Sequence, residues 1–176
     1  MNAMTVRRQI PDRLSVPQLR ARWRQLIDDP LVAAIPYKIE LNERGSIEVS
    51  PASTRHGFLQ AYLARELHRL RADGTTFTEC PVETAIGIRV PDVTWASADF
   101  VRRHGMPTTL PEAPELCIEV ISPSNTPAEI NEKVTAYLAA GAHEVWLVPE
   151  MGPLEIFTKN GRQTASTLGF ELAPPE

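Results

Sequence analysis

Three ionisable residues, Asp92, Glu119 and Lys133, have the types and spacing of a site that holds a divalent metal ion near a phosphate group. Glu119 is the one charge in the apolar run Leu116–Ile121, which ends at a Ser-Pro-Ser turn, as a buried strand would. A buried carboxylate must be paired, neutralised or bound to a cation, because an isolated charge is very costly in a protein interior. Asp92 is a candidate neighbour, because it follows a proline and precedes a second predicted strand.

Two carboxylates that meet side by side repel each other, and a divalent cation between them relieves the repulsion. Mg²⁺ prefers one or two carboxylates together with water and phosphate oxygens. Asp92 and Glu119 therefore predict a Mg²⁺ site at the edge of a sheet, in which Mn²⁺ could take the place of Mg²⁺.

The helix that carries Lys133 has clear start and stop signals. Thr126 is its predicted N-cap, Pro127 occupies the first helical position, Glu129 completes a capping box and Gly141 marks the end. Lys133 falls at the edge of the apolar stripe, from which its ammonium can lean toward the sheet and offset charge on a phosphoryl group. The alternative is a lysine that packs its stem on the helix and keeps its charge in solvent.

These residues resemble the putative restriction endonuclease family, the Uma-type branch of the PD-(D/E)xK nuclease superfamily. The resemblance covers roughly residues 36–160 and rests on Tyr37 to Leu41 with Gly45, Ser53 with His56, Pro91-Asp92, Glu119 to Ser124, Lys133 with Tyr137, Gly141, and Val145 to Val148. The chain departs from the superfamily motif at Ile121, where a lysine is expected. In this family the lysine has moved to the following helix, and Lys133 matches that position.

The resemblance implies a restriction-type endonuclease that hydrolyses phosphodiester bonds of DNA with Mg²⁺. Asp92 and Glu119 would hold the ion, and the Val120 carbonyl would add a ligand. Glu40 would assist near the metal, although strand alternation alone makes it a solvent-facing acid, and Lys133 would position the attacking water. A homodimer is a further expectation, because cutting both strands needs two sites. The alternative is a catalytically inactive nuclease-fold protein that binds nucleic acid or a partner protein.

The overall charge does not advertise a nucleic-acid partner, because 18 basic and 22 acidic residues give a formal net charge of -4. The cluster Arg102, Arg103 and His104 is the one basic cluster near the predicted site, so substrate-backbone contacts are expected there, with a loop tip as the alternative. Cys80 and Cys117 lack metal-ligand spacing and are expected to be reduced thiols in a cytoplasmic protein. No apolar run approaches the roughly 20 residues of a membrane span.

The surrounding pattern predicts an α/β or α+β fold of the restriction-endonuclease type, with a mixed central sheet flanked by helices. The predicted elements are helices over 16–28, 53–70 and 126–140, a hairpin over 37–50, one or two strands within 77–88, and strands over 93–96, 116–121, 144–148, 154–158 and 163–168. We expect an N-terminal extension with one helix over residues 1–35, a nuclease-like domain over 36–170 and a tail over 171–176. Residues 1 to about 13 and 172–176 are expected to be mobile.

Several polar residues outside the main motif have open interpretations. His56 could reach the site or simply make a hydrogen bond near the surface, and the second is favoured. Glu79 and Glu83 could support the site, but exposed strand positions are favoured for both. The face of the first helix that carries Arg20, Arg22 and Arg24 could touch phosphates, and a solvated face is favoured.

Overall fold

The computed structural model describes residues 13–172 and 175. The expectations of mobile ends lie almost entirely outside these residues. The helices are α1 (Val16–Ile27), α2 (Pro30–Ala33), α3 (Thr54–Leu70), α4 (Ala98–His104) and α5 (Pro127–Ala139). The strands are β1 (Lys38–Asn42), β2 (Ile47–Ser50), β3 (Gly74–Thr78), β4 (Val82–Thr84), β5 (Gly87–Arg89), β6 (Val93–Ser97), β7 (Leu116–Ile121), β8 (Glu144–Pro149), β9 (Glu155–Thr158) and β10 (Gly161–Gln163).

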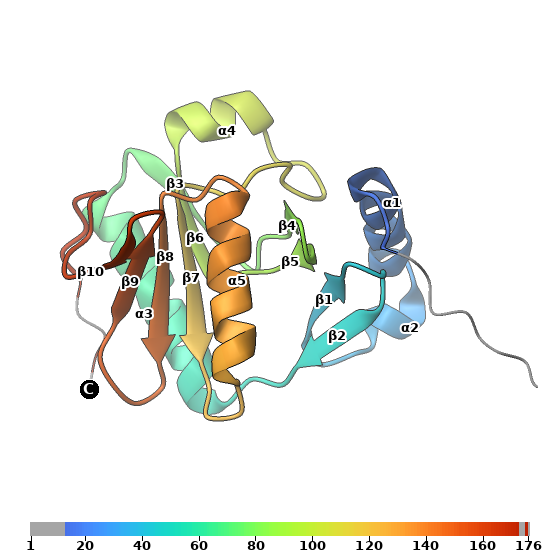
Figure 1. Ribbon diagram of the computed structural model, residues 1–176, viewed down its shortest axis with the longest axis horizontal. Coiled ribbons are helices and arrows are strands. Elements are labelled where there is room, and N and C mark those ends of the chain that lie inside the picture. The colour runs from blue at the N-terminus through green and yellow to red at the C-terminus, as the bar shows by residue number, and fades with distance from the viewer. Residues whose placement is uncertain (1–12, 173–174, 176) are drawn as a thin grey trace, which may run out of the picture.

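A mixed six-stranded sheet forms the centre of the molecule, in the order β10-β9-β8-β7-β6-β3 (Figure 1). Strands β7 and β8 are parallel and are joined through α5, while the other neighbouring pairs are antiparallel. Helix α3 packs its leucines Leu59, Leu63 and Leu67 on one face, and α5 covers the other face. Because side chains alternate along β7, Ile118 and Val120 point toward α3 and Glu119 points toward α5.

A smaller antiparallel sheet, in the order β2-β1-β5-β4, lies beside the central one and is covered by α1 (Figure 1). Leu19, Trp23 and Leu26 of α1 pack against Leu41 and Ile88 of this sheet. The predicted helix with Ser15 as its N-cap and the predicted hairpin are thus both present, and α2 is an additional short helix. The boundaries proposed for the domain and its extension stay a prediction.

Two charged residues join α1 to the small sheet. The guanidinium of Arg20 donates two hydrogen bonds to Glu83, at 2.6 and 2.7 Å, and the Thr109 hydroxyl donates a third at 2.6 Å. The favoured interpretation of Glu83 as an exposed strand residue is therefore wrong, because its carboxylate is buried and tethers α1. Arg22 and Arg24 are exposed, as a solvated helix face predicts.

Gly87 lies where β5 passes close to β1. Its φ is +127°, and an added Cβ would sit 1.9 Å from the carbonyl oxygen of Leu41. Only glycine fits this combination of positive φ and close backbone approach.

The basic cluster at the end of α4 does not lie beside the predicted site. Helix α4 follows the end of β6, whereas Asp92 precedes its start, so the two lie at opposite ends of that strand (Figure 1). Arg103 and His104 both contact Glu112, at 3.6 and 3.3 Å. The expectation of substrate contacts here was wrong because sequence proximity to Asp92 hid the length of the intervening strand.

Glu144, at the start of β8, holds the segment after β10 against the sheet. It is fully buried and accepts hydrogen bonds from Trp146, Ser166 and Leu168 at 2.8, 2.9 and 3.1 Å. Thr167 adds its hydroxyl at 2.6 Å and its backbone N–H. Burial raises the pKa of the Glu144 carboxyl, but these donors outweigh burial and keep the pKa below its usual value.

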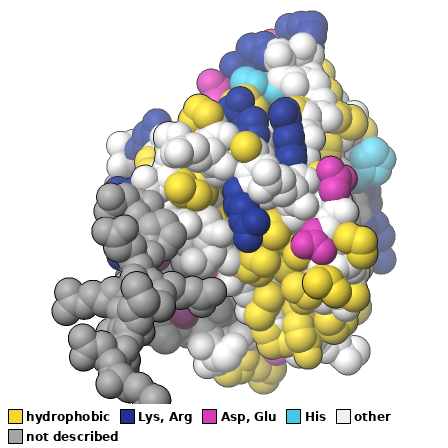
Figure 2. Space-filling model, turned by 90° about the vertical axis from the view of Figure 1, so that its right-hand side faces the viewer, with side chains coloured by type: hydrophobic (Ala, Val, Ile, Leu, Met, Phe, Trp, Pro, Cys, Tyr) yellow, Lys and Arg dark blue, Asp and Glu magenta, His cyan; other side chains and the backbone are white. Residues whose placement is uncertain are grey.

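One face of the molecule, formed by α1, α2 and the β1–β2 hairpin, carries a group of hydrophobic side chains (Figure 2). The large exposed hydrophobic residues of these elements include Ile27, Leu31, Tyr37 and Val49. Both cysteines are free, as predicted. Across the described ranges, none of the helices combines the length and apolar character needed to cross a bilayer.

Candidate active site

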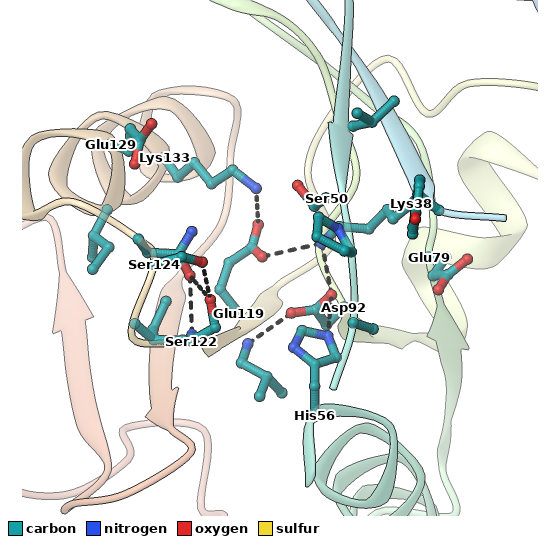
Figure 3. A pocket seen from close by; sticks show the side chains of 18 of the residues that line it. Lys38, Ser50, His56, Glu79, Asp92, Glu119, Ser122, Ser124, Glu129 and Lys133 are labelled. Atoms are coloured by element: carbon teal, nitrogen blue, oxygen red, sulfur yellow. Dashed lines mark hydrogen bonds and ion pairs between the residues drawn. The ribbon is translucent and has the colours of Figure 1, made fainter. Parts of the chain in front are cut away.

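A cavity of about 540 Å³ opens between the hairpin and the central sheet (Figure 3). Asp92 and Glu119 lie at its floor, and Lys133 enters from α5. Lys38 enters from the opposite side, on β1, and His56 rises from the first turn of α3. The cavity is therefore formed by elements of both sheets, and its polar groups converge on the two carboxylates.

Asp92 is held on both of its oxygens. Its Oδ2 accepts a hydrogen bond from the Val120 N–H at 2.7 Å, which fixes it to the end of β7. Its Oδ1 accepts from the Lys38 ammonium at 2.6 Å and lies 3.2 Å from His56 Nε2. The residue is 1% exposed. Burial raises the pKa of Asp92, but His56 and Lys38 outweigh burial and hold the pKa well below its usual value, so the group is ionised.

Glu119 is the second buried carboxylate. Its Oε1 accepts hydrogen bonds from Lys133 Nζ at 3.1 Å and from the Tyr137 hydroxyl at 2.7 Å, and its Oε2 lies 3.5 Å from Lys38 Nζ. Burial raises the pKa of Glu119, and the two ammonium groups oppose this only in part. Glu119 is therefore the acid of the pair that an added cation would stabilise most.

Glu40 joins the same cluster from β1. Its carboxylate lies 3.0 Å from Lys133 Nζ and accepts the Val90 N–H at 2.7 Å, and Arg89 lies 3.5 Å away. Strand alternation predicted a solvent-facing acid, which is wrong: Glu40 is 4% exposed, because the small sheet presses this face of β1 against the central sheet. Burial raises the pKa of Glu40, but Lys133 and Lys38 keep it below its usual value.

Lys133 points into the cluster rather than into solvent, which contradicts the alternative interpretation. The capping box of α5, in which Thr126 and Glu129 exchange hydrogen bonds, sets the rotation of the helix so that Lys133 faces β7. Its ammonium bridges Glu40 and Glu119. Burial lowers the pKa of Lys133, and these two carboxylates raise it above its usual value.

Two members of the cluster, Lys38 and His56, were not assigned to the site from the sequence. Lys38 has a side chain only 9% exposed, and the carboxylates raise its pKa well above the usual value although burial lowers it. Alternation along β1 gave it to solvent. The available signal was charge: three buried acids need more than the single cation Lys133. For His56, the hydrogen bond with Asp92 raises the pKa above its usual value.

Oxygen ligands suited to a hard divalent cation are present at the floor of the cavity. The Ile121 carbonyl accepts the Glu150 N–H at 2.9 Å on the β8 side, and the Val120 N–H points to Asp92. Because both polar groups of a strand residue face the same side, the Val120 carbonyl also faces Asp92. Two carboxylates and a carbonyl fit Mg²⁺. No group of three or more His, Cys, Asp or Glu side chains among the described residues has metal-site geometry, and this ligand set contains two such side chains.

Comparisons with known proteins agree with this fold. The family model Uma2, described as putative restriction endonuclease, matches residues 29–175. Among solved structures, the chain is similar to the crystal structure of a putative nuclease belonging to DUF820 from Anabaena variabilis ATCC 29413, with a TM-score of 0.63 and 17% sequence identity. The similarity covers 74% of this chain and 79% of that one. A search of the curated proteins gave no match. The predicted nuclease fold, with its mixed sheet flanked by helices, is confirmed.

Proposed function

The chain belongs to the Uma2 family of putative restriction endonucleases, and we propose from this that it is a Mg²⁺-dependent endonuclease that hydrolyses phosphodiester bonds of DNA. One observation carries the proposal within the site itself. Asp92 and Glu119, from two adjacent strands, converge at the floor of a cavity, and the ammonium of Lys133 lies 3.1 Å from Glu119.

Asp92 and Glu119 would hold the ion, and the Val120 carbonyl would add a third oxygen. When bound, Mg²⁺ supplies Lewis acidity, which polarises the phosphodiester and lowers the pKa of the attacking water. The N–H of Val120 keeps Asp92 in place while its other oxygen faces the cavity. The Tyr137 hydroxyl, whose pKa burial raises well above its usual value, stays neutral and orients Glu119 by donation at 2.7 Å.

Lys133 would position the attacking water and offset the negative charge that develops on the phosphoryl group. Glu40 assists by holding the Lys133 ammonium at 3.0 Å, so that the lysine stays charged and directed at the floor of the cavity. His56 lies 3.2 Å from Asp92 and would keep that carboxylate ionised.

The features around the cavity support a nucleic-acid substrate. Ser122, Ser124 and Asn125 line the cavity beside Lys133 and can donate hydrogen bonds to phosphate and sugar oxygens. The exposed hydrophobic face includes Tyr37 and Val49, which also line the cavity, so a second copy that covered this face would bring two sites together. We therefore propose a homodimer for cutting both strands, and a cytoplasmic location in which the free cysteines stay reduced.

A nuclease-fold binding module without catalysis is the second candidate. It is favoured by one observation: Asp92, Glu119 and Glu40 are each already paired with a cationic side chain of the protein. A binding module would retain these pairs and bind no metal ion, whereas the enzyme must accommodate one.

The test combines calorimetric titration of Mg²⁺ or Mn²⁺ with plasmid cleavage by wild type, Asp92→Ala and Lys133→Ala. Glu112→Gln serves as the control, because this exposed acid lies near α4, away from the cavity. The enzyme requires that Asp92→Ala abolish metal binding, that both site variants lose cleavage, and that the control behave as wild type. Wild-type protein that binds no metal and cuts no plasmid would leave the binding module.

A further inference from the structure

The ammonium of Lys38 occupies the place between the two site acids. It lies 2.6 Å from Asp92 Oδ1 and 3.5 Å from Glu119 Oε2 (Figure 3). The other oxygens of these carboxylates are bound elsewhere: Asp92 Oδ2 accepts a backbone N–H of β7, and Glu119 Oε1 accepts from two side chains of α5. The oxygens left to bridge a metal ion are therefore the two that face Lys38.

We infer that a divalent ion enters this site by displacing Lys38, which makes Lys38 a built-in competitor that sets the metal affinity of the protein. This inference rests on the proposed metal-dependent function and deepens it. Lys38 belongs to β1 of the small sheet, whereas Asp92 and Glu119 belong to the central sheet. The competitor and the ligands are thus carried by different structural units.

The charges of the cluster favour exchange over simple addition. Asp92, Glu119 and Glu40 are three acids, and Lys38 and Lys133 are the two ammonium groups in contact with them. A divalent ion added beside both lysines would place an excess of positive charge in a buried volume, which is unfavourable. If Lys38 leaves, the ion and Lys133 together match the three carboxylates.

The displaced side chain has somewhere to go. Lys38 lines the cavity of about 540 Å³ together with Tyr37 and Ser50, and its stem rotates about four carbon atoms. Its ammonium would move into the cavity, where it would face the phosphate of a bound substrate. Lys38 would then be a positioning residue in the loaded protein, in addition to its role as competitor.

Chemical labelling of lysine tests the displacement in wild-type protein. The chain has only three lysines, Lys38, Lys133 and Lys159, so an acylating reagent followed by mass spectrometry reports each one separately. We expect saturating Mn²⁺ to increase labelling of Lys38 several-fold, while exposed Lys159 is unchanged and Lys133 stays protected. Asp92→Asn should abolish the increase. Labelling of Lys38 that does not change while Mn²⁺ is bound would overturn the inference.

Calorimetry with Mn²⁺ tests the competition. Replacing Lys38 by Met removes a cation that must otherwise be displaced from carboxylates, and we expect the Kd to fall by about 10- to 100-fold. Lys133→Met is the matched control, because this second buried lysine contacts Glu119 without lying between the two acids, and its effect should be smaller.

The outcomes separate the inference from the proposed function. Equal Mn²⁺ affinity of wild type and Lys38→Met, with cleavage present in wild type, overturns the role of Lys38 and leaves the metal-dependent nuclease intact. Tight binding by Lys38→Met and weak binding by wild type supports the competition. An absence of binding by either protein overturns both the inference and the metal dependence.

Discussion

Replacing Lys133 by Met should lower the free energy of unfolding by about 3 kcal/mol at neutral pH, because it leaves two buried carboxylates without their shared cation. The side chain is 21% exposed and its ammonium lies 3.0 Å from Glu40 and 3.1 Å from Glu119. Removing one partner of a buried pair costs about 3 to 5 kcal/mol. The lower value applies here, because Glu40 keeps the Val90 N–H and Glu119 keeps the Tyr137 hydroxyl.

Urea unfolding followed by tryptophan fluorescence measures this loss. With an m-value of about 2 kcal/mol/M, the midpoint should fall by about 1.5 M. Lys159→Met is the control, since Lys159 is exposed and its replacement should change stability by less than about 0.5 kcal/mol. Adding Glu40→Gln to Lys133→Met should recover about 1 kcal/mol or more, because one unpaired buried charge is removed.

The pH dependence of the same variant has a defined sign. Burial already raises the pKa of Glu119, and loss of Lys133 raises it further. An acid whose folded pKa is raised destabilises the native state above that pKa, so the deficit of Lys133→Met should shrink as the pH falls and Glu119 takes up a proton. A variant as stable as wild type at neutral pH, or a deficit that grows on acidification, would refute the burial of this ammonium between the two acids.

Three further predictions concern other parts of the molecule. The pKa of His56 is raised above 6.5 by its hydrogen bond with Asp92, so its stabilising effect is full below pH 6.5 and is lost as the pH rises through the raised pKa. The stability difference between wild type and His56→Gln in urea should therefore shrink above pH 6.5, and a constant difference would count against a charged pair. Glu144→Gln should lose about 2 kcal/mol in the same assay, because its buried carboxylate accepts bonds from five donor groups, yet plasmid cleavage should be unchanged; reduced cleavage would show that this anchor also shapes the site. Gly87→Ala should destabilise by at least about 2 kcal/mol more than Gly161→Ala, since both have positive φ but only Gly87 would place its Cβ against backbone, and equal losses would refute the steric argument.

The sequence predicted most of the elements because their signals are local. The capping box before Lys133 and the leucine stripe of α3 each lie within one helix, so no knowledge of the fold was needed to find them. Glu119 was also recognisable, because a single acid in an apolar strand demands a partner wherever that strand packs. The structure brings Asp92, Glu119, Lys133 and Glu40 together as expected, while their catalytic roles stay a prediction.

The errors come from contacts between the two sheets, which local patterns do not encode. Alternation along β1 correctly separates its two faces, but it cannot say that the face bearing Lys38 and Glu40 is covered by the central sheet. The same limit applies to Glu83, whose partner Arg20 is 63 residues away. The basic cluster of α4 was placed wrongly for a related reason, because a five-residue strand carries the chain away from Asp92.

The contacts that complete the cluster also join distant parts of the chain. Lys38 meets Asp92 across 54 residues and Glu119 across 81, and Glu40 meets Lys133 across 93. Closing such long loops is entropically expensive, so these pairs are expected to form late in folding, after the local helices and hairpins. During synthesis, a chain that has emerged from the ribosome only as far as β7 still lacks Lys133. The protein thus acquires its complete set of charged groups only near the end of its own production, when a newly made nuclease is already folded around them.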